Sequence, residues 1–365
     1  MSDFEAMKAS LEEVCGIVNG YIEKCPYFYD HTLKEITTGT LAYLTRPGKK
    51  ARPAVLIWSY LACGGDPEAL EGVLPIACGL EATHTWTLIH DDIIDCDEKR
   101  RGGDSMHVIG RKLAGSLFGV DEPSAAEKYG ETYSILIGDT LHAISVAMML
   151  DSVRAGVPAE IACEIVRLLQ GETMRYLIEG ELLDVNFEYM QPGEVDCETI
   201  LRMIRGKTSS LLSYSALFGA MLGVGTADKN HPTVRNVGNY ANACGTAFQL
   251  KDDILGLTGD EKALGKPVGS DLREGKKTYP IYLAIERMSE SEKARFFGIY
   301  GNPGASGEEL AEAAELIRRT GAIAETEALA ASLVDKAKPL IGGLPDTLYK
   351  RLLLGWGDYM VRRSH

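Results

Sequence analysis

Residues 88–95 read LIHDDIID, and residues 249–256 read QLKDDILG. In each stretch, two adjacent aspartates lie within a segment whose hydrophobic residues recur at helical spacing, which predicts an α-helix. Carboxylates are costly to bury among apolar side chains unless they meet a cation. The two stretches therefore predict a helical protein in which two acidic helices bind cations.

Helical periodicity continues outward from these stretches over most of the chain. The predicted helices cover residues 4–24, 54–63, 73–95, 127–150, 158–189, 198–224, 233–255, 278–288, 308–318 and 322–340. Glycine and proline breakers separate them, and no stretch shows the period-two alternation that would demand a sheet. No repeat or linker divides the chain, so the sequence predicts one all-α domain spanning residues 1–365.

The composition argues against several classes of protein. The 365 residues carry a formal net charge of −14, whereas a general nucleic-acid-binding protein needs a basic surface. Eight cysteines without a CxxC pair favour reduced thiols in a cytoplasmic protein over a disulfide scaffold or a zinc site. Residues 208–227 contain no charge, but their serines and glycines favour a buried helix over a membrane span.

The spacing of the acids points to metal chemistry. Asp91 and Asp95 are four residues apart, so both project from one helix face, about 5–6 Å apart. Two carboxylates at this spacing can bind Mg²⁺ ions that also contact the phosphate oxygens of a substrate. Asp252 supplies a similar acid from the second helix. Either acidic pair alone fits an N-cap or a solvated helix face equally well; their repetition in an apolar context favours the metal site.

Five short basic motifs complement these acids, and each adjoins a glycine or a proline. They read GKKARP at 48–53, RRG at 100–102, GKT at 206–208, GKP at 265–267 and GKKT at 275–278. Each motif alone fits a solvated surface. Together they predict a local positive site for a phosphorylated substrate, because arginine and lysine are the expected phosphate ligands.

In this order and spacing, the motifs resemble those of the trans-type isoprenyl diphosphate synthases, also called polyprenyl synthetases. The resemblance runs from about Gly48 to Thr278. It implies an all-α, isoprenoid-synthase-type helical bundle with a central active-site cavity, usually a homodimer. It also implies a prenyltransferase that joins isopentenyl diphosphate head to tail to dimethylallyl, geranyl or farnesyl diphosphate through an allylic carbocation, releasing pyrophosphate.

The resemblance also implies a role for each motif. Its metal ligands would be Asp91, Asp95, Asp184 and Asp252, holding about three Mg²⁺ ions, with Mn²⁺ as an alternative. The allylic diphosphate would contact Arg100, Lys207, Gln249, Lys266 and Lys276. Isopentenyl diphosphate would contact Lys49, Arg52, His84 and Arg101. The Thr208 hydroxyl and the Gln249 amide oxygen would face the carbocation, so the implied catalytic residues are Asp91, Asp95, Lys207, Thr208, Gln249 and Asp252.

Three departures from the family pattern affect these expectations. Gly256 stands where the second acidic motif usually ends in aspartate, so Asp252 is expected to carry most of the metal contact there. Glu181 stands where a glutamine is common. Residues 103–126 form an insertion of about twenty residues, for which we favour a surface loop over a lid or a dimer contact, because long surface insertions are tolerated.

Trp86 is the candidate determinant of product length. It lies five residues before Asp91, about 7.5 Å along the helix axis, where a bulky side chain often forms the cavity floor in this family. With the small Thr87 beside it, the motif resembles archaeal-type short-chain enzymes that make farnesyl or geranylgeranyl diphosphate (C15–C20). Ordinary core packing is the alternative role of Trp86.

Three other functions stay open. A metal-dependent phosphohydrolase would use His84, His90 and Asp91, but it leaves the basic motifs without a role. A class I terpene cyclase would not need Lys49 and Arg52 for a second diphosphate. A non-catalytic regulatory subunit usually lacks acids of the first motif, which are complete here. The preferred allylic primer is not decided by the sequence.

Overall fold

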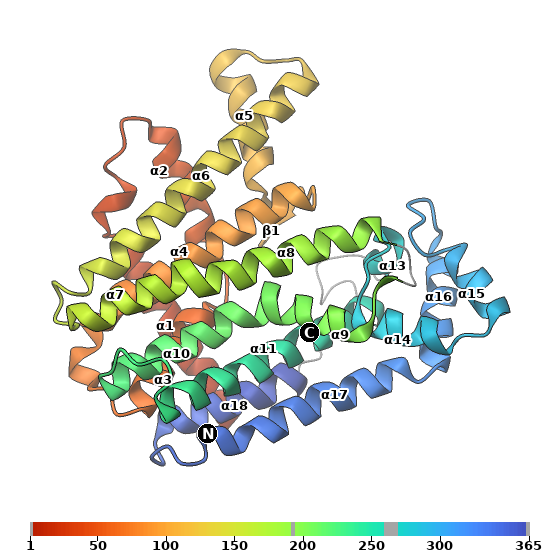
Figure 1. The fold of residues 1–365 in the computed structure, drawn as a ribbon. Helices are drawn as coiled ribbons and strands as arrows, with labels where there is room; N and C mark the ends of the chain where they lie inside the picture. The colour runs from red at the N-terminus through yellow and green to blue at the C-terminus, as the bar shows by residue number, and fades with distance from the viewer. Residues whose placement is uncertain (1–2, 191–193, 259–268, 363–365) are drawn as a thin grey trace. The chain divides into compact units, whose positions relative to one another are not determined.

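The computed structural model describes residues 3–190, 194–258 and 269–362. Helices make up nearly all of its regular structure (Figure 1). The sheet found among these residues is a small hairpin, in which β1 (Lys99–Arg100) pairs antiparallel with β2 (Gly103–Asp104). The predicted all-α fold is confirmed.

Each predicted helix has a counterpart. These are α1 (Asp3–Ile22), α3 (Ala51–Ala62), α4 (Leu70–Ile94), α6 (Pro123–Asp151), α7 (Ala159–Leu168), α8 (Met174–Tyr189), α9 (Cys197–Ile204), α10 (Ser210–Val224), α11 (Pro232–Thr258), α14 (Tyr279–Arg287), α16 (Gly307–Arg319) and α17 (Ala322–Ala337). Two π-helical turns interrupt the longer segments: η3 (Leu169–Thr173) joins α7 to α8, and η5 (Arg205–Ser209) joins α9 to α10.

Further helices were not predicted. They are α2 (Lys34–Leu44), α5 (Met106–Phe118), α13 (Ser270–Glu274), α15 (Glu290–Phe297) and α18 (Leu348–Arg362), with 3₁₀ turns η1 (Pro26–Phe28), η2 (Pro67–Ala69) and η6 (Lys338–Ile341). Helix α2 contains Thr-Thr-Gly-Thr at 37–40 and α18 contains Gly-Trp-Gly at 355–357. Threonine and glycine have low helix propensity, so burial of side chains such as Tyr43 and Trp356 stabilises these helices instead.

The expectation of a surface loop for residues 103–126 is wrong. This segment forms β2, α5 and the start of α6, and α5 packs along α6 (Figure 1). Glu122 accepts a hydrogen bond from the Ala125 N–H at 2.7 Å, and Pro123 occupies the first position of α6. A capped N-terminus with proline at its first position starts this helix earlier than periodicity alone suggests.

Tertiary contacts divide the chain into two compact units. The first comprises Met1–Arg167 and Phe218–Lys229, and the second comprises Leu168–Leu217 and Asn230–His365. Within the first unit, α4 packs along α6 and against α3, and α1 packs on α3. The single domain expected over residues 1–365 stays a prediction.

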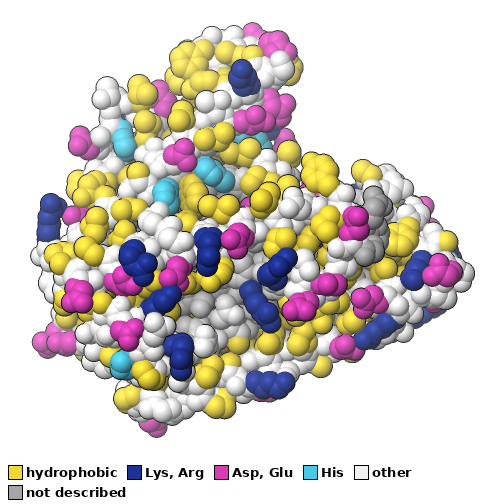
Figure 2. Space-filling view, viewed as in Figure 1, with side chains coloured by type: hydrophobic (Ala, Val, Ile, Leu, Met, Phe, Trp, Pro, Cys, Tyr) yellow, Lys and Arg dark blue, Asp and Glu magenta, His cyan; other side chains and the backbone are white. Residues whose placement is uncertain are grey.

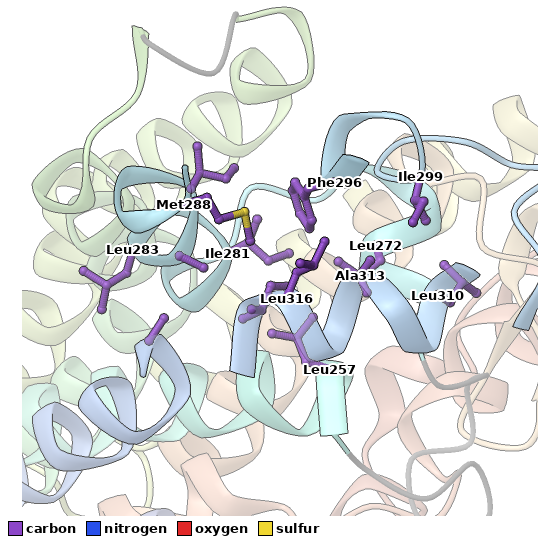
Figure 3. Close-up of a cluster of buried hydrophobic side chains, with 14 of the residues drawn as sticks. Leu257, Leu272, Ile281, Leu283, Met288, Phe296, Ile299, Leu310, Ala313 and Leu316 are labelled. Atoms are coloured by element: carbon purple, nitrogen blue, oxygen red, sulfur yellow. The ribbon is translucent and has the colours of Figure 1, made fainter. Parts of the chain in front are cut away.

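Within the second unit, α11 packs along α17 and α18, and η5 packs on both α8 and α11. A hydrophobic cluster surrounds the C-terminal end of α11 (Figure 3). Its members include Leu257, Leu272, Ile281, Phe296 and Leu316, drawn from α11, α13, α14, α15 and α16. This core fixes the helix end that follows the second acidic motif.

One described helix, α6, is long and apolar enough to cross a bilayer, but half of its apolar window is buried inside the protein. A core helix of a soluble protein has the same properties. In the uncharged segment 208–227, Ser210 Oγ donates to the Gly206 carbonyl and Ser215 Oγ to the Leu211 carbonyl, both at 2.6 Å. Both serines are buried, as a packed helix requires.

Candidate active site

The first acidic motif lies at the C-terminal end of α4, in the first unit. Asp91 is in the last turn of α4, and Asp95 is its C-cap. Arg100 of β1 places Nη2 at 3.2 Å from Asp91 Oδ2 and at 3.2 Å from Asp97 Oδ2. The structure thus brings together a predicted metal ligand and a predicted diphosphate ligand.

Asp92, the middle acid of the motif, is a buried anchor. It accepts hydrogen bonds from Arg100 Nε at 2.5 Å and from the Tyr43 hydroxyl, which itself accepts from the Met106 N–H at 3.0 Å. Burial raises the pKa of Asp92, and the hydrogen bonds from Arg100 and Tyr43 oppose this rise. Asp92 therefore positions Arg100, a role that the sequence did not reveal.

A second cluster in the first unit centres on His84 and Arg52. Arg52 Nη1 lies 2.8 Å from His84 Nε2. A guanidinium has no acceptor, so Nε2 must accept this hydrogen bond and the proton of the neutral imidazole resides on Nδ1. Burial, with the charges of Arg52 and Arg101, lowers the pKa of His84 well below its ordinary value. Neutral His84 therefore offers Nδ1–H as a donor.

Three donors in this cluster are buried without a hydrogen-bond partner: Arg52 Nε, His84 Nδ1 and Arg101 Nη1. Gly48 closes over the same cluster, because a Cβ at that position would lie 3.2 Å from Arg101 Cζ. Buried donors of this kind usually have an acceptor, and an anionic oxygen would satisfy several at once. Their arrangement suits a phosphate group.

A buried ion pair lies next to this cluster and contacts it through Arg101. Lys50 Nζ lies 3.1 Å from Glu81 Oε1 and also donates to the Leu44 carbonyl at the end of α2. Both side chains are almost fully buried, and Glu81 Oε1 is also 3.7 Å from Arg101 Nη1. Lys50 is the N-cap of α3 and lies in the left-handed region, with φ of 44°. Lys49, its exposed neighbour, carries the predicted substrate contact.

The buried imidazole predicts a pH dependence of stability. Because folding lowers the pKa of His84, the unfolded state takes up a proton more readily than the folded state does. The neutral imidazole therefore makes its full contribution to the free energy of unfolding above about pH 6.5, and this contribution is lost as the pH falls. We expect His84→Asn to flatten the decline in the free energy of unfolding below about pH 6.5, by at most about 1.4 kcal/mol per pH unit. Denaturant unfolding of both proteins across this range measures the difference. Equal slopes would contradict a buried neutral imidazole.

Trp86 on α4 packs against two histidines. Its ring centroid lies 4.7 Å from that of His142 on α6 and 5.5 Å from that of His90. Thr87, beside it, donates a hydrogen bond to the His84 carbonyl at 2.7 Å. His142 was missed by sequence analysis, because it is far from Trp86 in the chain and belongs to no motif.

In the second unit, η5 places the predicted Lys207 beside acids of α8. A Cβ at Gly206 would lie 2.7 Å from the Tyr176 carbonyl, and one at Gly180 would overlap the backbone nitrogen of Lys207. Only glycines allow this close approach of the two backbones. As a result, Lys207 Nζ lies 2.7 Å from Asp184 and 3.1 Å from Glu181. The family departure at Glu181 thus supplies a second carboxylate to Lys207.

A hydrogen-bonded chain links η5 to α11. Thr208 Oγ1 donates to Gln249 Oε1 at 2.9 Å, and Gln249 Nε2 donates to Asp253 Oδ1 at 3.0 Å. Burial raises the pKa of Asp253 to about 7, and the hydrogen bond from Gln249 opposes the rise. Asp252 is the next residue on α11. The predicted Thr208, Gln249 and Asp252 therefore lie on two packed segments, and Asp253 orients the Gln249 amide.

The two lysines at 276 and 277 differ in environment. Lys277 Nζ donates to the Phe187 carbonyl near the end of α8, and burial lowers its pKa. Lys276 lies 3.5 Å from Glu274. Lys277 thus has a structural contact, which leaves Lys276 as the better candidate for diphosphate. The predicted ligand Lys266 lies outside the described residues.

A groove of about 710 Å³ in the second unit is separate from these residues. It is bounded by α8, α9, η5, α10 and α11, and its α8 lining includes Glu179, Leu183 and Asn186. Helical periodicity puts these residues on the opposite side of α8 from Glu181 and Asp184. The described candidates for catalysis and metal binding do not line this groove.

The donor set suits Mg²⁺ shared with a substrate. Within the described ranges, no three His, Cys, Asp or Glu side chains converge into a ready-made metal cage. Mg²⁺ typically takes only one or two protein carboxylates and completes its shell with substrate phosphates and water. The carboxylates of Asp91 and Asp95, one turn apart, fit that requirement.

Comparison with known proteins agrees with this chemistry. A short chain isoprenyl diphosphate synthase of Methanothermobacter thermautotrophicus is 33% identical over 360 residues, covering 97% of this chain and 99% of its own. A geranylgeranyl pyrophosphate synthetase structure from Pyrococcus horikoshii Ot3 aligns with TM-score 0.84 and 29% identity, covering 99% of this chain and 100% of its own.

A geranylgeranyl pyrophosphate synthase from Corynebacterium glutamicum, complexed with isoprenyl diphosphate and magnesium, aligns with TM-score 0.82 and 26% identity, covering 100% of both chains. The polyprenyl synthetase family model matches residues 34–317. The trans-prenyltransferase that the motifs predicted is thereby confirmed, and the chain belongs to the polyprenyl synthetase family.

Proposed function

We propose that this enzyme condenses isopentenyl diphosphate with an allylic diphosphate to give a short-chain (C15–C20) trans-prenyl diphosphate. The observation that carries the proposal is that cationic and hydrogen-bond-donating side chains form two separate features in the first unit. Arg52 Nε, His84 Nδ1 and Arg101 Nη1 are buried donors without a hydrogen-bond partner, while Arg100 lies at the acids of α4. Two diphosphates need two such features, whereas a terpene cyclase or a phosphohydrolase needs only one.

The reaction balances without a protein nucleophile. The allylic C–O bond breaks, and pyrophosphate leaves with the electron pair. The isopentenyl double bond then attacks the allylic carbocation to form the new C–C bond, and transfer of a proton to the released pyrophosphate restores a double bond. Divalent metal, held by Asp91, Asp95, Asp184 and Asp252, would neutralise the charge that develops on pyrophosphate. Mg²⁺ fits these hard oxygen donors, and Mn²⁺ is the alternative.

The side chains of the protein bind and orient the two diphosphate substrates. Arg100, Lys207, Lys266 and Lys276 are proposed to hold the allylic diphosphate, and Lys49 joins the Arg52 cluster at isopentenyl diphosphate. The carboxylates of Asp184 and Glu181 keep the Lys207 ammonium in place. Thr208 Oγ1 donates to Gln249, so the remaining lone pairs of both groups can face the carbocation.

A homodimer in the cytoplasm is the proposed state of the enzyme. Along α6, Ile135, Leu136 and Leu150 are 46%, 60% and 41% exposed. Figure 2 shows hydrophobic side chains on the surface over α5 as well. Exposed apolar patches of this kind mark protein interfaces, which supports the dimer. The eight cysteines are all free thiols, which is consistent with a reducing compartment such as the cytoplasm.

Incubation of the purified protein with Mg²⁺, dimethylallyl diphosphate and labelled isopentenyl diphosphate tests this function. The expected result is a discrete farnesyl or geranylgeranyl diphosphate with one pyrophosphate released per condensation. Pyrophosphate without elongation would instead support the cyclase or hydrolase. No turnover with any allylic primer would support a regulatory subunit.

Trp86→Ala is expected to lengthen the main product by at least one isoprene unit, because it removes the side chain that would close the cavity. Chromatographic sizing of the products measures this change. Trp86→Phe keeps most of the bulk and should leave the product unchanged. An unaltered distribution from Trp86→Ala would assign Trp86 to core packing against His142 instead.

A further inference from the structure

The two arginines of the RRG motif lie at the tip of the β1–β2 hairpin. Arg100 pairs with Gly103, so Arg101 and Gly102 form a two-residue turn. Both turn residues have positive φ, 51° for Arg101 and 77° for Gly102. Turns of this kind favour asparagine and glycine, and another residue in the left-handed region is strained unless its surroundings hold it. Contacts outside the turn must therefore stabilise it.

The hairpin presents its two arginines to different surroundings. The Arg100 side chain lies at the acids of α4, 3.2 Å from Asp91 Oδ2. Arg101 instead has Nη1 at 3.7 Å from Glu81 Oε1, in the cluster around His84. In the proposed function, Arg100 binds the allylic diphosphate and Arg101 binds isopentenyl diphosphate. The position of one hairpin therefore affects the binding of both substrates.

Arg46, which belongs to none of the five basic motifs, contacts the backbone of this hairpin. It follows the C-terminal end of α2, and its Nη1 donates a hydrogen bond to the Arg100 carbonyl at 3.0 Å. A Cβ at Gly103 would lie 2.9 Å from Arg46 Cζ, so the guanidinium occupies the space beside this glycine. Arg46 thus contacts the two residues between which the strained turn lies.

Tyr43 orients the Arg46 guanidinium. Arg46 Cζ lies 4.5 Å from the centroid of the Tyr43 ring, as in a cation–π interaction. The hydroxyl of the same ring donates to Asp92, which accepts from the Arg100 side chain. Tyr43 is buried and belongs to α2. One tyrosine therefore orients both the group that binds the Arg100 backbone and the group that binds its side chain.

We propose that Arg46 is a positioning residue for the prenyl transfer, because it holds the β1–β2 hairpin so that Arg100 and Arg101 face their separate diphosphates. Arg46 acts through the hairpin and does not bind substrate itself. The inference rests on the proposed function, which assigns the two diphosphates to these two arginines. Because one side chain supports both of them, its loss is expected to weaken the binding of both substrates together.

Arg46→Met removes the guanidinium and keeps most of the apolar stem. KM for dimethylallyl diphosphate and KM for isopentenyl diphosphate should each rise about tenfold, as expected for loss of a hydrogen bond from a charged donor. The value of kcat should change less than either KM, because saturating diphosphates hold the arginines in place. Arg154→Met, at an exposed arginine of the same unit, is the control and should keep wild-type constants. Wild-type KM values in Arg46→Met would overturn the inference.

Gly103→Ala tests the same contact with Arg46 intact. Gly103 is not among the described glycines with positive φ, so alanine adds no backbone strain, and its methyl group displaces the flexible end of Arg46. Both KM values should rise as in Arg46→Met. The double variant should match the single variants, because both changes remove one contact. Multiplied effects, or wild-type KM values in Gly103→Ala, would contradict the proposal.

A second double-mutant comparison separates positioning from direct binding. In an Arg100→Met background, Arg46→Met should have little further effect on KM for dimethylallyl diphosphate, because its effect on this substrate passes through Arg100. Its effect on KM for isopentenyl diphosphate should persist, because Arg101 is retained. If the effect on dimethylallyl diphosphate is the same in both backgrounds, Arg46 binds this substrate directly and the inference is wrong.

Amide hydrogen exchange of the substrate-free protein gives a readout that is independent of activity. Arg46→Met should speed exchange in residues 99–104 and leave the interior of α4 unchanged. Faster exchange throughout the first unit would show general destabilisation and overturn the positioning role. Failure of the wild-type protein to condense the two diphosphates would contradict the proposed function itself, whereas wild-type condensation with unaltered KM values in Arg46→Met would overturn this inference alone.

Discussion

Asp91→Asn and Asp95→Asn are each expected to lower kcat by about 10³-fold, because each variant loses a charged oxygen that we propose as a ligand of the metal that stabilises departing pyrophosphate. The fold should survive both changes. Arg100 keeps its contacts with Asp92 and Asp97 when Asp91 is neutral, and Asp95 caps α4 through its backbone N–H, which asparagine retains. Steady-state kcat at saturating substrates, measured across a Mg²⁺ titration, checks the prediction.

The matched control is Asp121→Asn, an exposed aspartate in the turn between α5 and α6 of the same unit. It should leave both kcat and Mg²⁺ dependence unchanged. If Asp91→Asn and Asp95→Asn keep wild-type kcat at all Mg²⁺ concentrations, the acids of α4 are not metal ligands. A large fall in Tm in either variant would instead point to a structural role.

Lys207→Met is expected to have the second-largest effect, lowering kcat by about 10²-fold. The ammonium is held by Asp184 at 2.7 Å and Glu181 at 3.1 Å, so it is oriented before substrate arrives. A preorganised cation of this kind stabilises charge that develops on the leaving group. Pre-steady-state measurement of allylic C–O cleavage, by pyrophosphate release in a single turnover, reports the affected step.

Lys251→Met is the control for Lys207→Met, because Lys251 forms a comparable ion pair in the same unit, 2.9 Å from Glu327. Its removal should leave cleavage unchanged. Lys207→Arg keeps the charge on a longer, forked group and should retain more activity than methionine. Equal single-turnover rates for Lys207→Met and wild type would show that Lys207 does not contribute to the cleavage step.

Much of the candidate site could be predicted because its motifs are local. The i, i+4 spacing of Asp91 and Asp95 follows from helical geometry wherever the helix lies. Lys207 and Thr208 were found through their glycine neighbour, and the structure shows why: Gly206 lets η5 approach Gly180. What the motif did not predict is that its lysine lies in a π-helical turn.

The partners of these motif residues could not be predicted, because each contact joins distant parts of the sequence. Tyr43 donates a hydrogen bond to Asp92, and Lys50 forms an ion pair with Glu81. No local periodicity encodes either pair. A buried acid in an apolar helix was the available signal, and it indicates that a partner exists without indicating which residue provides it.

The sequence by itself determined the helical class, the spacing of acids and cations along each helix, and the family, since these depend on periodicity and short motifs. Only the tertiary structure decided that α5 is a helix packed along α6 and that Asp92 anchors Arg100. The physical reason is the same in each case. Packing and burial bring together residues whose separation along the chain carries no information about their contact.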